Sequence, residues 1–547
     1  MGEGGGLMED LLEKKKQVKY SIDKLMDEIQ QKLVDERLQI DQKDEKLTRK
    51  RVLLSEMIRQ AVSGDQNAKN YVINKIIKTL TTEMDIKQEN INYILSFNEI
   101  KKLSYYYQFH ILSLKYDISK VIDKYNDQFM IIDFSDAGNN IFSKEIFEKI
   151  IDIELNEQNL QLDYIEKINV IANIIYAEVY GLSIIDRIEF MDINEVGVNG
   201  YQYVWVQHRG SKIWLEFLEY PDNNVLNNVC KNAVSFNSKF DLSPSNPGII
   251  CQRYDGSRIT CALQPFYSEP TLNLRRFNLG NFNPDKMVKL GTIDELSKNL
   301  LNVLIKGRSN IIIAGGMGDG KSTTLMTLIN FVPGARAIGT IEENLELRLK
   351  ARHPSKNVIE AQAVPGKPIS TAFEFMLKQA RDIVILGEIT NSEEATQLIN
   401  VMLRLCRGSM GTFHSENPKA VIINLRNLLL KSGFYHNEMV AQADVVEAVN
   451  IVIQMTHDSK GRRFVDYITE IEPVSDGEGS VVTSNFRTRH LMERINGEFH
   501  FANIISEEYS EKLLKYGSSK EELEEINAKI LERMKLHPKL KNTRGKA

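Results

Sequence analysis

The second half of the chain alternates helical patterns with short runs of wholly apolar residues. These runs lie at residues 311–314, 337–341, 383–386 and 449–455. A strand that is covered by helices on both faces needs no polar alternation, so continuous apolar runs of this length indicate buried parallel strands. We therefore expect an α/β domain over residues 291–475. A tail at 476–547 follows, with a few strands and a charged helix near 519–534.

The first 160 residues show helical periodicity. Near the N-terminus, apolar residues recur every three or four positions and would line one stripe of a helix. They are Leu11, Val18, Ile22, Leu25, Ile29 and Leu33. A break at Ser63-Gly64-Asp65 precedes a second periodic stretch at 72–80. We expect residues 1–160 to form a helical, partly coiled-coil-like extension with no assigned chemistry, and the lysine run at 14–16 to lie on a solvated helix face.

Residues 161–282 have the pattern of a small α/β domain. From about residue 190, short β-prone runs alternate with turn residues. Asn199-Gly200 lies between two such runs and is a strong hairpin signal. The next turn is expected at 209–212. Asn283-Pro284-Asp285 then predicts a linker over residues 283–290.

Composition narrows the class of protein. The 547 residues suffice for about three or four domains, and the net charge of −5 argues against a protein that mainly wraps nucleic acid. The apolar runs are far shorter than the ~18 residues needed to span a bilayer, and no secretory signal is visible. We expect a cytoplasmic protein that binds no nucleic acid directly and contacts the membrane only through partners. The four cysteines are scattered, which favours buried thiols over disulfides or a zinc site.

Residues 315–322 match the phosphate-binding motif G-x-x-x-x-G-K-[ST] without a mismatch. They read Gly315-Gly316-Met317-Gly318-Asp319-Gly320-Lys321-Ser322. An apolar run precedes the motif and a helical pattern follows it, as a P-loop requires. We expect the glycines of the motif, Asp319 and Thr323 to bind the nucleotide together with Lys321 and Ser322. Glycines let backbone N–H groups turn toward phosphate, and the helix start adds positive potential. Lys321 is expected to reach the β- and γ-phosphates of ATP, and the Ser322 hydroxyl to hold Mg²⁺; the alternative is a glycine-rich structural turn.

Two later apolar runs end in acidic residues. The first ends in Glu342-Glu343 and the second in Gly387-Glu388. Ligands of open α/β sheets gather at the carboxyl edge of the strands. A carboxylate at that edge can polarise an attacking water or hold Mg²⁺ through water. Taken alone, the Glu342-Glu343 pair also fits a solvated strand end.

A fourth motif, GSMGTFH at residues 408–414, ends in His414, which alone would fit a satisfied core histidine. In this order the four motifs resemble the Walker A, Asp box, Walker B and His box of the type II/type IV secretion ATPases. The resemblance implies a RecA-like P-loop NTPase domain that hydrolyses ATP with Mg²⁺. It further implies that Glu342 or Glu343 positions the attacking water, that Glu388 orders the metal side through water, and that His414 senses the γ-phosphate.

Other segments resemble the CpaF-like branch of that superfamily, which powers Flp/Tad pilus assembly or export. They are GLSIID and INEVGVNG within 181–200, DGSR at 255–258, LRRF at 274–277, and GRR and ITEI within 461–471. The resemblance covers about residues 165–530 and implies a PAS-like fold for the small domain. It also implies a hexamer at the inner face of the cell membrane, docked on a platform protein.

In that family, arginines of the N-terminal domain reach the nucleotide phosphates. By position, Arg258, Arg275 and Arg276 are the matching candidates, and a guanidinium binds phosphate oxygens through two N–H groups. Charges on a surface strand are the alternative for each.

The chain departs from the family pattern at three places. The second acid of the Asp box is Glu343, the two arginines before Walker B are lost from register at 377–382, and Thr390 replaces the arginine after it. These losses concern contacts between subunits and the turnover rate. The lost arginines leave open a nucleotide-binding scaffold with weak hydrolysis. A motor for conjugative transfer also stays open, because its chemistry would be the same and only its partner would differ.

Overall fold

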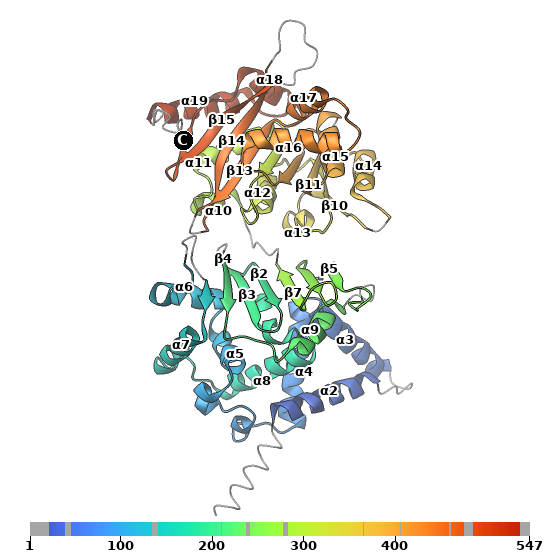
Figure 1. The fold of residues 1–547 in the computed structure, drawn as a ribbon, viewed down its shortest axis with the longest axis vertical. Coiled ribbons are helices and arrows are strands. Elements are labelled where there is room, and N and C mark those ends of the chain that lie inside the picture. The colour runs from blue at the N-terminus through green and yellow to red at the C-terminus, as the bar shows by residue number, and fades with distance from the viewer. Residues whose placement is uncertain are drawn as a thin grey trace, which may run out of the picture. The chain divides into compact units, whose positions relative to one another are not determined.

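The computed structural model describes residues 21–38, 45–133, 140–208, 211–236, 241–276, 283–364, 366–404, 406–458, 461–474 and 485–536. The chain divides into two compact units, unit 1 at Met1–Asn278 and unit 2 at Leu279–Ala547. Each unit has a β-sheet of its own, with helices packed on it (Figure 1).

In the described part of the chain, unit 1 is built on a seven-stranded sheet with the order β1-β4-β3-β2-β7-β6-β5. The strands are β1 (Ile141–Phe142), β2 (Glu195–Asn199), β3 (Tyr203–His208), β4 (Ser211–Leu215), β5 (Gly248–Gln252), β6 (Arg258–Ala262) and β7 (Thr271–Arg275). Neighbouring strands pair antiparallel, except that β1 pairs with β4 in parallel.

The helices of unit 1 come mostly from its first half. They are α2 (Ile22–Leu38), α3 (Glu45–Val62), α4 (Gln66–Lys78), α5 (Tyr105–Lys115), α6 (Ile118–Phe129), α7 (Lys144–Asn156), α8 (Tyr164–Val179) and α9 (Asn223–Val234). Shorter helical turns are η1 (Thr79–Glu83), η2 (Ile91–Tyr93), η3 (Phe97–Lys102), η4 (Ser183–Ile185) and η5 (Ile188–Phe190).

Local hydrogen bonds set where several helices begin. The Asp65 carboxylate accepts a hydrogen bond from Ala68 N at 2.9 Å at the start of α4. Asp163 and Glu166 form a reciprocal capping box at the start of α8. Such caps satisfy N–H groups that have no partner within the first turn. The break predicted at residues 63–65 is confirmed as the turn between α3 and α4.

The hairpin predicted at Asn199-Gly200 is confirmed and joins β2 to β3. Gly200 has a φ of 61°, a left-handed conformation that favours glycine. The centre of the next predicted turn, residues 209–210, lies outside the described residues. All four cysteines are buried, as predicted.

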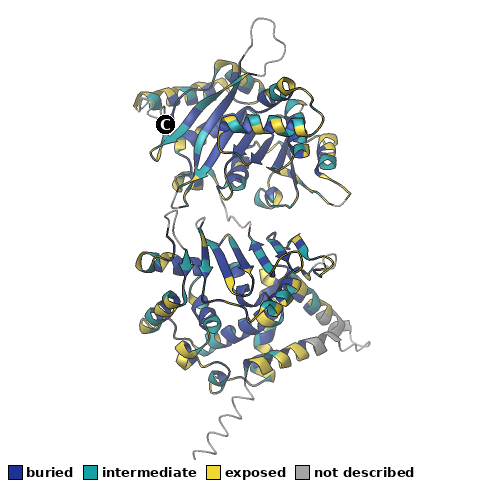
Figure 2. Ribbon diagram, viewed as in Figure 1, coloured by how far each residue is buried: buried dark blue, intermediate teal, exposed yellow. Residues whose placement is uncertain are grey.

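Helices from the first 160 residues share one hydrophobic core with the sheet of unit 1. Ile29 on α2 and Val72 on α4 are fully buried and belong to the same cluster as Val196 and Val206 of the sheet. Figure 2 shows the alternation of buried and exposed positions along these helices. The predicted apolar stripe is confirmed from Ile22 to Leu33, whereas Leu11, Val18 and the lysine run lie outside the described residues.

The described residues of unit 2 form a nine-stranded sheet with the order β10-β9-β11-β12-β8-β13-β14-β15-β16. The strands are β8 (Ile311–Ala314), β9 (Ala337–Glu342), β10 (Asn357–Gln362), β11 (Ile383–Ile389), β12 (Met410–Phe413), β13 (Ile451–His457), β14 (Arg463–Pro473), β15 (Phe486–Ile495) and β16 (Glu498–Phe501). The strands from β10 to β13 in that order are parallel, and β14 to β16 continue the sheet antiparallel.

The helices of unit 2 pack on both faces of this sheet. They are α10 (Pro284–Lys289), α11 (Glu295–Lys306), α12 (Lys321–Leu328), α13 (Leu349–Arg352), α14 (Ile369–Lys378), α15 (Ser392–Arg404), α16 (Pro418–Lys431), α17 (Glu438–Ala448), α18 (Glu507–Tyr516) and α19 (Lys520–Leu536), with the short turn η6 (Ile329–Phe331). Ile311 and Ile313 of β8 belong to one core, and Ile312 and Ala314 belong to another. A strand buried on both faces explains the continuous apolar run, and the predicted α/β fold class is confirmed.

Residues 283–290 depart from their sequence pattern, whereas the tail contains the strands and the charged helix that its pattern predicts. Residues 283–290, predicted as a linker, contain helix α10, which the Asn283 side chain caps by accepting a hydrogen bond from Lys286 N at 2.9 Å. The tail after residue 475 extends the sheet through β15 and β16, and its helices α18 and α19 contribute to the core of unit 2. No helix in the described part of the chain is long and apolar enough to cross a bilayer.

The shared core of unit 1 predicts that α2 contributes to its stability. Ile29→Ala removes a fully buried side chain and is expected to lower the free energy of unfolding by about 2–5 kcal/mol, measured by denaturant titration. Gln30→Ala, on the exposed face of the same helix, should change it by less than about 0.5 kcal/mol. Equal effects of the two substitutions would contradict a shared core.

Candidate nucleotide site

Strand register brings the four sequence motifs to one edge of the sheet of unit 2. Ala314 at the end of β8 is the register partner of Phe413 at the end of β12. Leu386 on β11 is the partner of Ile341 on β9. Residues at the carboxyl ends of these parallel strands therefore share one edge, where open α/β sheets bind ligands. They are the P-loop, His414, Glu388 and the Glu342-Glu343 pair.

The P-loop, residues 315–322, connects β8 to α12. Gly318 and Gly320 have φ values of 82° and 89°, a region that residues with a Cβ rarely adopt. Helix α12 begins at Lys321, so the N–H groups of its first turn are directed at the loop. Ser322 and Thr323 in that turn are half-buried. This backbone geometry is suited to holding an anion such as phosphate.

The Lys321 side chain connects the P-loop to the histidine motif. Its Nζ donates a hydrogen bond to Gly316 O at 2.7 Å and lies 3.4 Å from Nδ1 of His414. The other ring nitrogen of His414, Nε2, lies 2.7 Å from Oε1 of Glu388. The structure therefore brings together a lysine, a histidine and a carboxylate from three separate motifs. Because the His414 and Glu388 side chains are 46% and 47% exposed, solvent weakens their attraction, and the contact chiefly orients the imidazole ring.

Asp319 directs its carboxylate to its own loop. Its Oδ2 accepts a hydrogen bond from Gly316 N at 2.5 Å, and its Oδ1 lies 2.5 Å from Nδ1 of His457 on β13. Arg463 on β14, the register partner of His457, donates from Nε to Gly318 O at 2.6 Å. The β13–β14 hairpin thus holds the loop at two points. Asp319 was expected among the nucleotide-binding residues, whereas sequence analysis gave His457 no role and Arg463 none beyond the family motif.

Glu342 is buried at the end of β9. Its Oε1 accepts hydrogen bonds from Glu346 N and Leu347 N at 3.0 Å each, and its Oε2 has no hydrogen-bond partner among the described residues. Burial raises the pKa of this carboxyl to about 8, so it is mostly protonated at neutral pH. A Cβ at position 387 would lie 2.8 Å from Glu342 Cγ. This contact explains why Gly387 occupies the usual aspartate position of the Walker B motif.

Glu343 lies in a different environment from its neighbour. Its side chain is exposed, and its backbone oxygen accepts a hydrogen bond from Gln362 Nε2 at 3.0 Å. Of the two adjacent acids, Glu343 is the one whose carboxylate stays accessible to solvent at the sheet edge.

The oxygen donors at this edge fit Mg²⁺ rather than a softer metal. Ser322 offers a hydroxyl and Glu388 a half-exposed carboxylate, and both are hard ligands of the kind Mg²⁺ prefers. No group of three or more His, Cys, Asp or Glu that could hold a metal ion is present in the described part of the chain. Mg²⁺ commonly takes one or two protein ligands and completes its shell with water and substrate phosphates.

A pocket of about 620 Å³ opens beside the first half of the P-loop, a volume in the range of small-ligand sites. His414, which follows β12, and Gln454 on β13 are among the residues that line this pocket. Gln454 donates from Nε2 to Ser415 O at 2.9 Å and so holds the backbone that follows His414. Its Oε1 is buried and has no hydrogen-bond partner within the described residues. Sequence analysis missed Gln454 because it lies within an apolar run that predicts only a buried strand.

Thr390, which stands where the family pattern has an arginine, is part of a helix cap. Glu394 Oε2 accepts hydrogen bonds from Thr390 N at 2.6 Å, from Thr390 Oγ1 at 2.8 Å and from Asn391 N at 3.2 Å. These contacts close the connection between β11 and α15 directly after Glu388. The departure from the family pattern therefore has a local structural role.

The three candidate arginines lie at the end of two strands in unit 1. Arg258 begins β6 and is the register partner of Arg275 at the end of β7, while Glu195 on β2 is the partner of Arg275 on its other side. Two like charges directly opposite one another are unfavourable, and Glu195 on the next strand places an opposite charge beside them. Arg276 donates from Nη1 to Met191 O at 2.6 Å.

The family model of the type II/IV secretion system proteins matches residues 183–535. The chain belongs to this family. The match includes all four motifs at the edge of the unit 2 sheet and the candidate arginines of unit 1.

The curated relatives that this chain matches are distant. A Mycobacterium tuberculosis protein is 25% identical over 228 residues, which cover 41% of this chain and 63% of the relative. Conjugal transfer protein TrbB of Rhizobium radiobacter is 23% identical over 217 residues, covering 39% of this chain and 64% of the relative. The match thus spans less than two thirds of either relative. Protein VirB11 of Agrobacterium fabrum is 25% identical over 274 residues, covering 44% of this chain and 77% of VirB11.

Solved structures with detectable similarity include the pilus retraction motor PilT with bound ADP and the VirB11 ATPase of Brucella suis. PilT is 14% identical with a TM-score of 0.38, and the match covers 63% of this chain and 86% of PilT. The Brucella suis VirB11 ATPase is 18% identical with a TM-score of 0.29, and the match covers 51% of this chain and 89% of that protein.

The raised pKa of Glu342 makes the stability of unit 2 of this secretion-family protein depend on pH. The folded-state pKa of about 8 lies above the ordinary value of 4.5, so between these values the folded protein keeps a proton that the unfolded chain releases. The stabilisation is complete below about pH 4.5 and is lost as the pH rises through about 8. Glu342→Gln cannot ionise and is expected to flatten the fall in unfolding free energy between about pH 5 and about pH 8 by on the order of 4 kcal/mol. Denaturant titrations across this range measure the profile.

Glu343→Gln provides the matched control, because it removes the neighbouring exposed carboxylate. Its pH profile of unfolding should follow that of the wild type. A pH profile of Glu342→Gln identical to that of the wild type would show that burial does not shift the pKa of this carboxyl.

Proposed function

We propose that this type II/IV secretion family member is an ATP-hydrolysing motor. The observation that carries the proposal is the contact series in which the Lys321 ammonium lies between a P-loop carbonyl and His414, which is itself paired with Glu388. Phosphoryl transfer to water needs phosphate charge to be neutralised and a water to be oriented, and a lysine in an anion-binding loop beside a histidine and a carboxylate supports that reaction.

In the proposed reaction, a water oxygen attacks the γ-phosphorus and the bond to the β–γ bridging oxygen breaks. Lys321 and the N–H groups of the P-loop neutralise charge on the β- and γ-phosphates. Glu343 positions the water, because Glu342 is mostly protonated and its Oε1 is occupied by backbone N–H groups. His414 senses the γ-phosphate from its position between Lys321 and Glu388. Mg²⁺, held by Ser322 and through water by Glu388, would screen the phosphate charges.

The proposal extends to assembly and cargo. We propose a hexamer in which Arg258, Arg275 and Arg276 help to bind nucleotide phosphates, and in which ATP hydrolysis drives the power stroke. The cargo would be pilin or a secreted protein, moved through a platform protein at the inner face of a bacterial membrane. The GLSIID, DGSR and GRR segments support the CpaF-like branch.

Conjugative transfer is a second candidate function. It is favoured by the name of the Rhizobium radiobacter relative, which is a conjugal transfer protein. The chemistry would be the same and only the platform and cargo would differ.

Loss of the P-loop lysine tests the central proposal. Lys321→Ala is expected to reduce ATP turnover to background, because losing one preorganised group that stabilises transition-state charge costs roughly 10²- to 10³-fold in rate. Phosphate release is measured on a sample whose oligomeric mass is determined by light scattering. Lys32→Ala, which removes an exposed lysine of unit 1, is the matched control. A Lys321→Ala protein with near-normal turnover would remove the assignment, and a wild type that binds ATP without turnover would favour the scaffold alternative.

The two adjacent acids are expected to behave differently. Glu343→Gln should lower kcat by roughly 100-fold if its carboxylate positions the water. Glu342→Gln should change kcat less than about threefold at neutral pH, because the native carboxyl is already mostly protonated there. Steady-state kinetics on both proteins check the expectation, and a reversed order would assign the water-positioning role to Glu342.

The cargo is tested in the native host with a chromosomal Lys321→Ala allele. Loss of surface pili or of secreted proteins with normal plasmid transfer supports the first function. Loss of plasmid transfer alone supports conjugation.

A further inference from the structure

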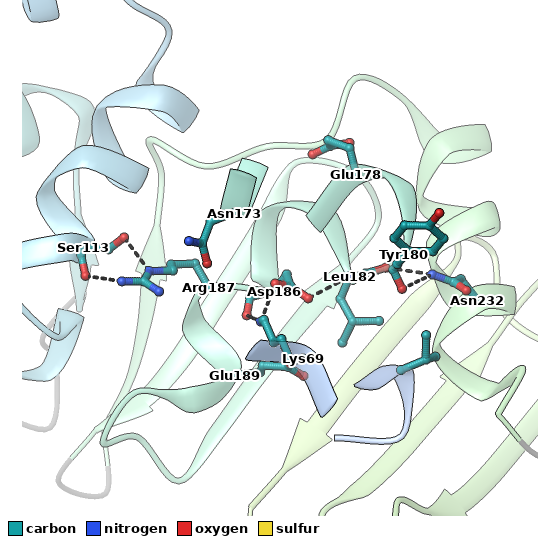
Figure 3. Close-up of polar contacts among 12 residues, drawn as sticks. Lys69, Ser113, Asn173, Glu178, Tyr180, Leu182, Asp186, Arg187, Glu189 and Asn232 are labelled. Carbon is teal, nitrogen blue, oxygen red and sulfur yellow. Dashed lines mark hydrogen bonds and ion pairs between the residues drawn. The ribbon is translucent and has the colours of Figure 1, made fainter. Parts of the chain in front are cut away.

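Four buried charges form a network in unit 1, remote in sequence from the P-loop. Lys69 on α4 lies 2.5 Å from Asp186 Oδ2 and donates to the Asp186 backbone oxygen at 3.1 Å (Figure 3). The same ammonium lies 3.5 Å from Glu189 Oε1. Arg253, which follows β5, pairs with Glu189 Oε2 at 2.6 Å. Two positive and two negative charges therefore balance.

Burial makes this network sensitive to the loss of any member. The four side chains are at most 6% exposed, and a buried charge is strongly unfavourable unless its partner is close and well oriented. Lys69 also lies over the rings of Tyr176 and Phe190, at 5.1 and 4.4 Å from their centroids. The ammonium is thus held from several sides.

The segment that carries Asp186 and Glu189 is itself fixed by neighbouring helices. Asn232 on α9 donates to Tyr180 O at 3.0 Å and to Gly181 O at 2.8 Å, and Arg187 donates to Ser113 on α5 at 2.8 and 2.9 Å (Figure 3). Gly181 lies so close to the Asp186 carboxylate that no Cβ would fit there. Asp186 and Glu189 are therefore rigid acceptors for the two cations.

What the network holds in place is the turn before β6. Arg253 N donates to Ser257 O at 2.8 Å and Gly256 N to Arg253 O at 3.0 Å, which closes residues 253–257 into a tight turn. Arg253 Nη2 also donates to Val62 O at 3.0 Å. The turn leads directly into Arg258, the first residue of β6.

The turn between α3 and α4 makes further contacts with the 253–257 turn. Tyr254 N donates to Ser63 O at 2.8 Å. Gly64 has a φ of 91°, and a Cβ there would lie 2.7 Å from Asp255 Cγ. The turn between α3 and α4 thus fixes residues 253–257 through a backbone hydrogen bond and close packing, in addition to the buried ion pairs.

We infer that Lys69, Glu189 and Arg253 are positioning residues of the motor, which fix the 253–258 turn so that Arg258 is presented to nucleotide phosphate. The inference rests on the proposed function. The inference extends the proposed function by giving a role to helices α3 and α4, which lie outside the region matched by the family model. A small displacement of a phosphate-binding group is enough to reduce a rate substantially.

The test compares two buried glutamates of unit 1 by the same substitution. Glu189→Gln weakens the network, whereas Glu154→Gln alters a buried carboxylate on α7 that accepts hydrogen bonds from Lys124, Tyr125 and Asn159 instead. Both remove one buried negative charge from the full-length protein. A third protein, Lys69→Met with Asp186→Asn, removes one charge of each sign and keeps the remaining pair balanced, so it serves if Glu189→Gln fails to fold.

The first readout needs no nucleotide. Hydrogen exchange of the backbone amides at 253–258 is expected to accelerate at least about tenfold in the network variants and to stay at the wild-type rate in Glu154→Gln. The second readout is kcat/KM for ATP, expected to fall roughly 10- to 100-fold in the same variants. Arg258→Ala added to Glu189→Gln should cause no further loss, because both act through one group.

Unchanged exchange at 253–258 in folded network variants would overturn the inference. So would losses of kcat/KM that add fully to that of Arg258→Ala, or that occur equally in Glu154→Gln. Absence of turnover in the wild type, or normal turnover in Lys321→Ala, would instead overturn the proposed function. Because exchange is measured without ATP, the two failures are distinguishable.

Discussion

The candidate site depends on parallel strands that end together. The P-loop, His414 and Glu388 come from three separate stretches of sequence, and they meet because β8, β12 and β11 are adjacent and in register. A slip of one residue would turn each side chain to the opposite face of the sheet. Pairing of β8 with β12 on one side and with β13 on the other opposes such a slip, because the hydrogen bonds to both neighbours would have to re-form out of register. The pairing of the strands therefore determines the geometry of the site.

The two units compensate buried acids in different ways. Glu342 in unit 2 has backbone donors for one oxygen and, among the described residues, no cation as a partner, so its carboxyl is mostly neutral at neutral pH. Asp186 and Glu189 in unit 1 face Lys69 and Arg253. A neutral carboxyl can change its protonation state when its surroundings change, whereas an ion pair fixes the positions of both of its groups. The protonated acid, Glu342, lies at the sheet edge where the proposed chemistry takes place. The paired acids, Asp186 and Glu189, lie beside the 253–257 turn that their cations hold.

Much of the fold and part of the candidate site could be predicted from sequence, for identifiable reasons. The strands of unit 2, the P-loop and the hairpin at Asn199 are determined by local patterns, and local patterns can be read directly. The roles of His457 and Gln454 could not be predicted, because each contacts a loop distant in sequence through its strand neighbours. Nor could the difference between Glu342 and Glu343, because it depends on which side chain the fold buries.

The helices before residue 160 show most clearly which structural features a sequence pattern does not predict. Their periodicity predicts an apolar stripe but not what the stripe packs against, and the family match begins only at residue 183. In the structure, those helices supply Ile29 and Val72 to the core of unit 1 and Lys69 to its buried charges. Without Lys69, Asp186 and Glu189 would face one cation, and an unpaired buried charge is strongly destabilising. The physical boundary of unit 1 therefore lies where its apolar surface and its charges are both compensated, well before the boundary that sequence similarity defines.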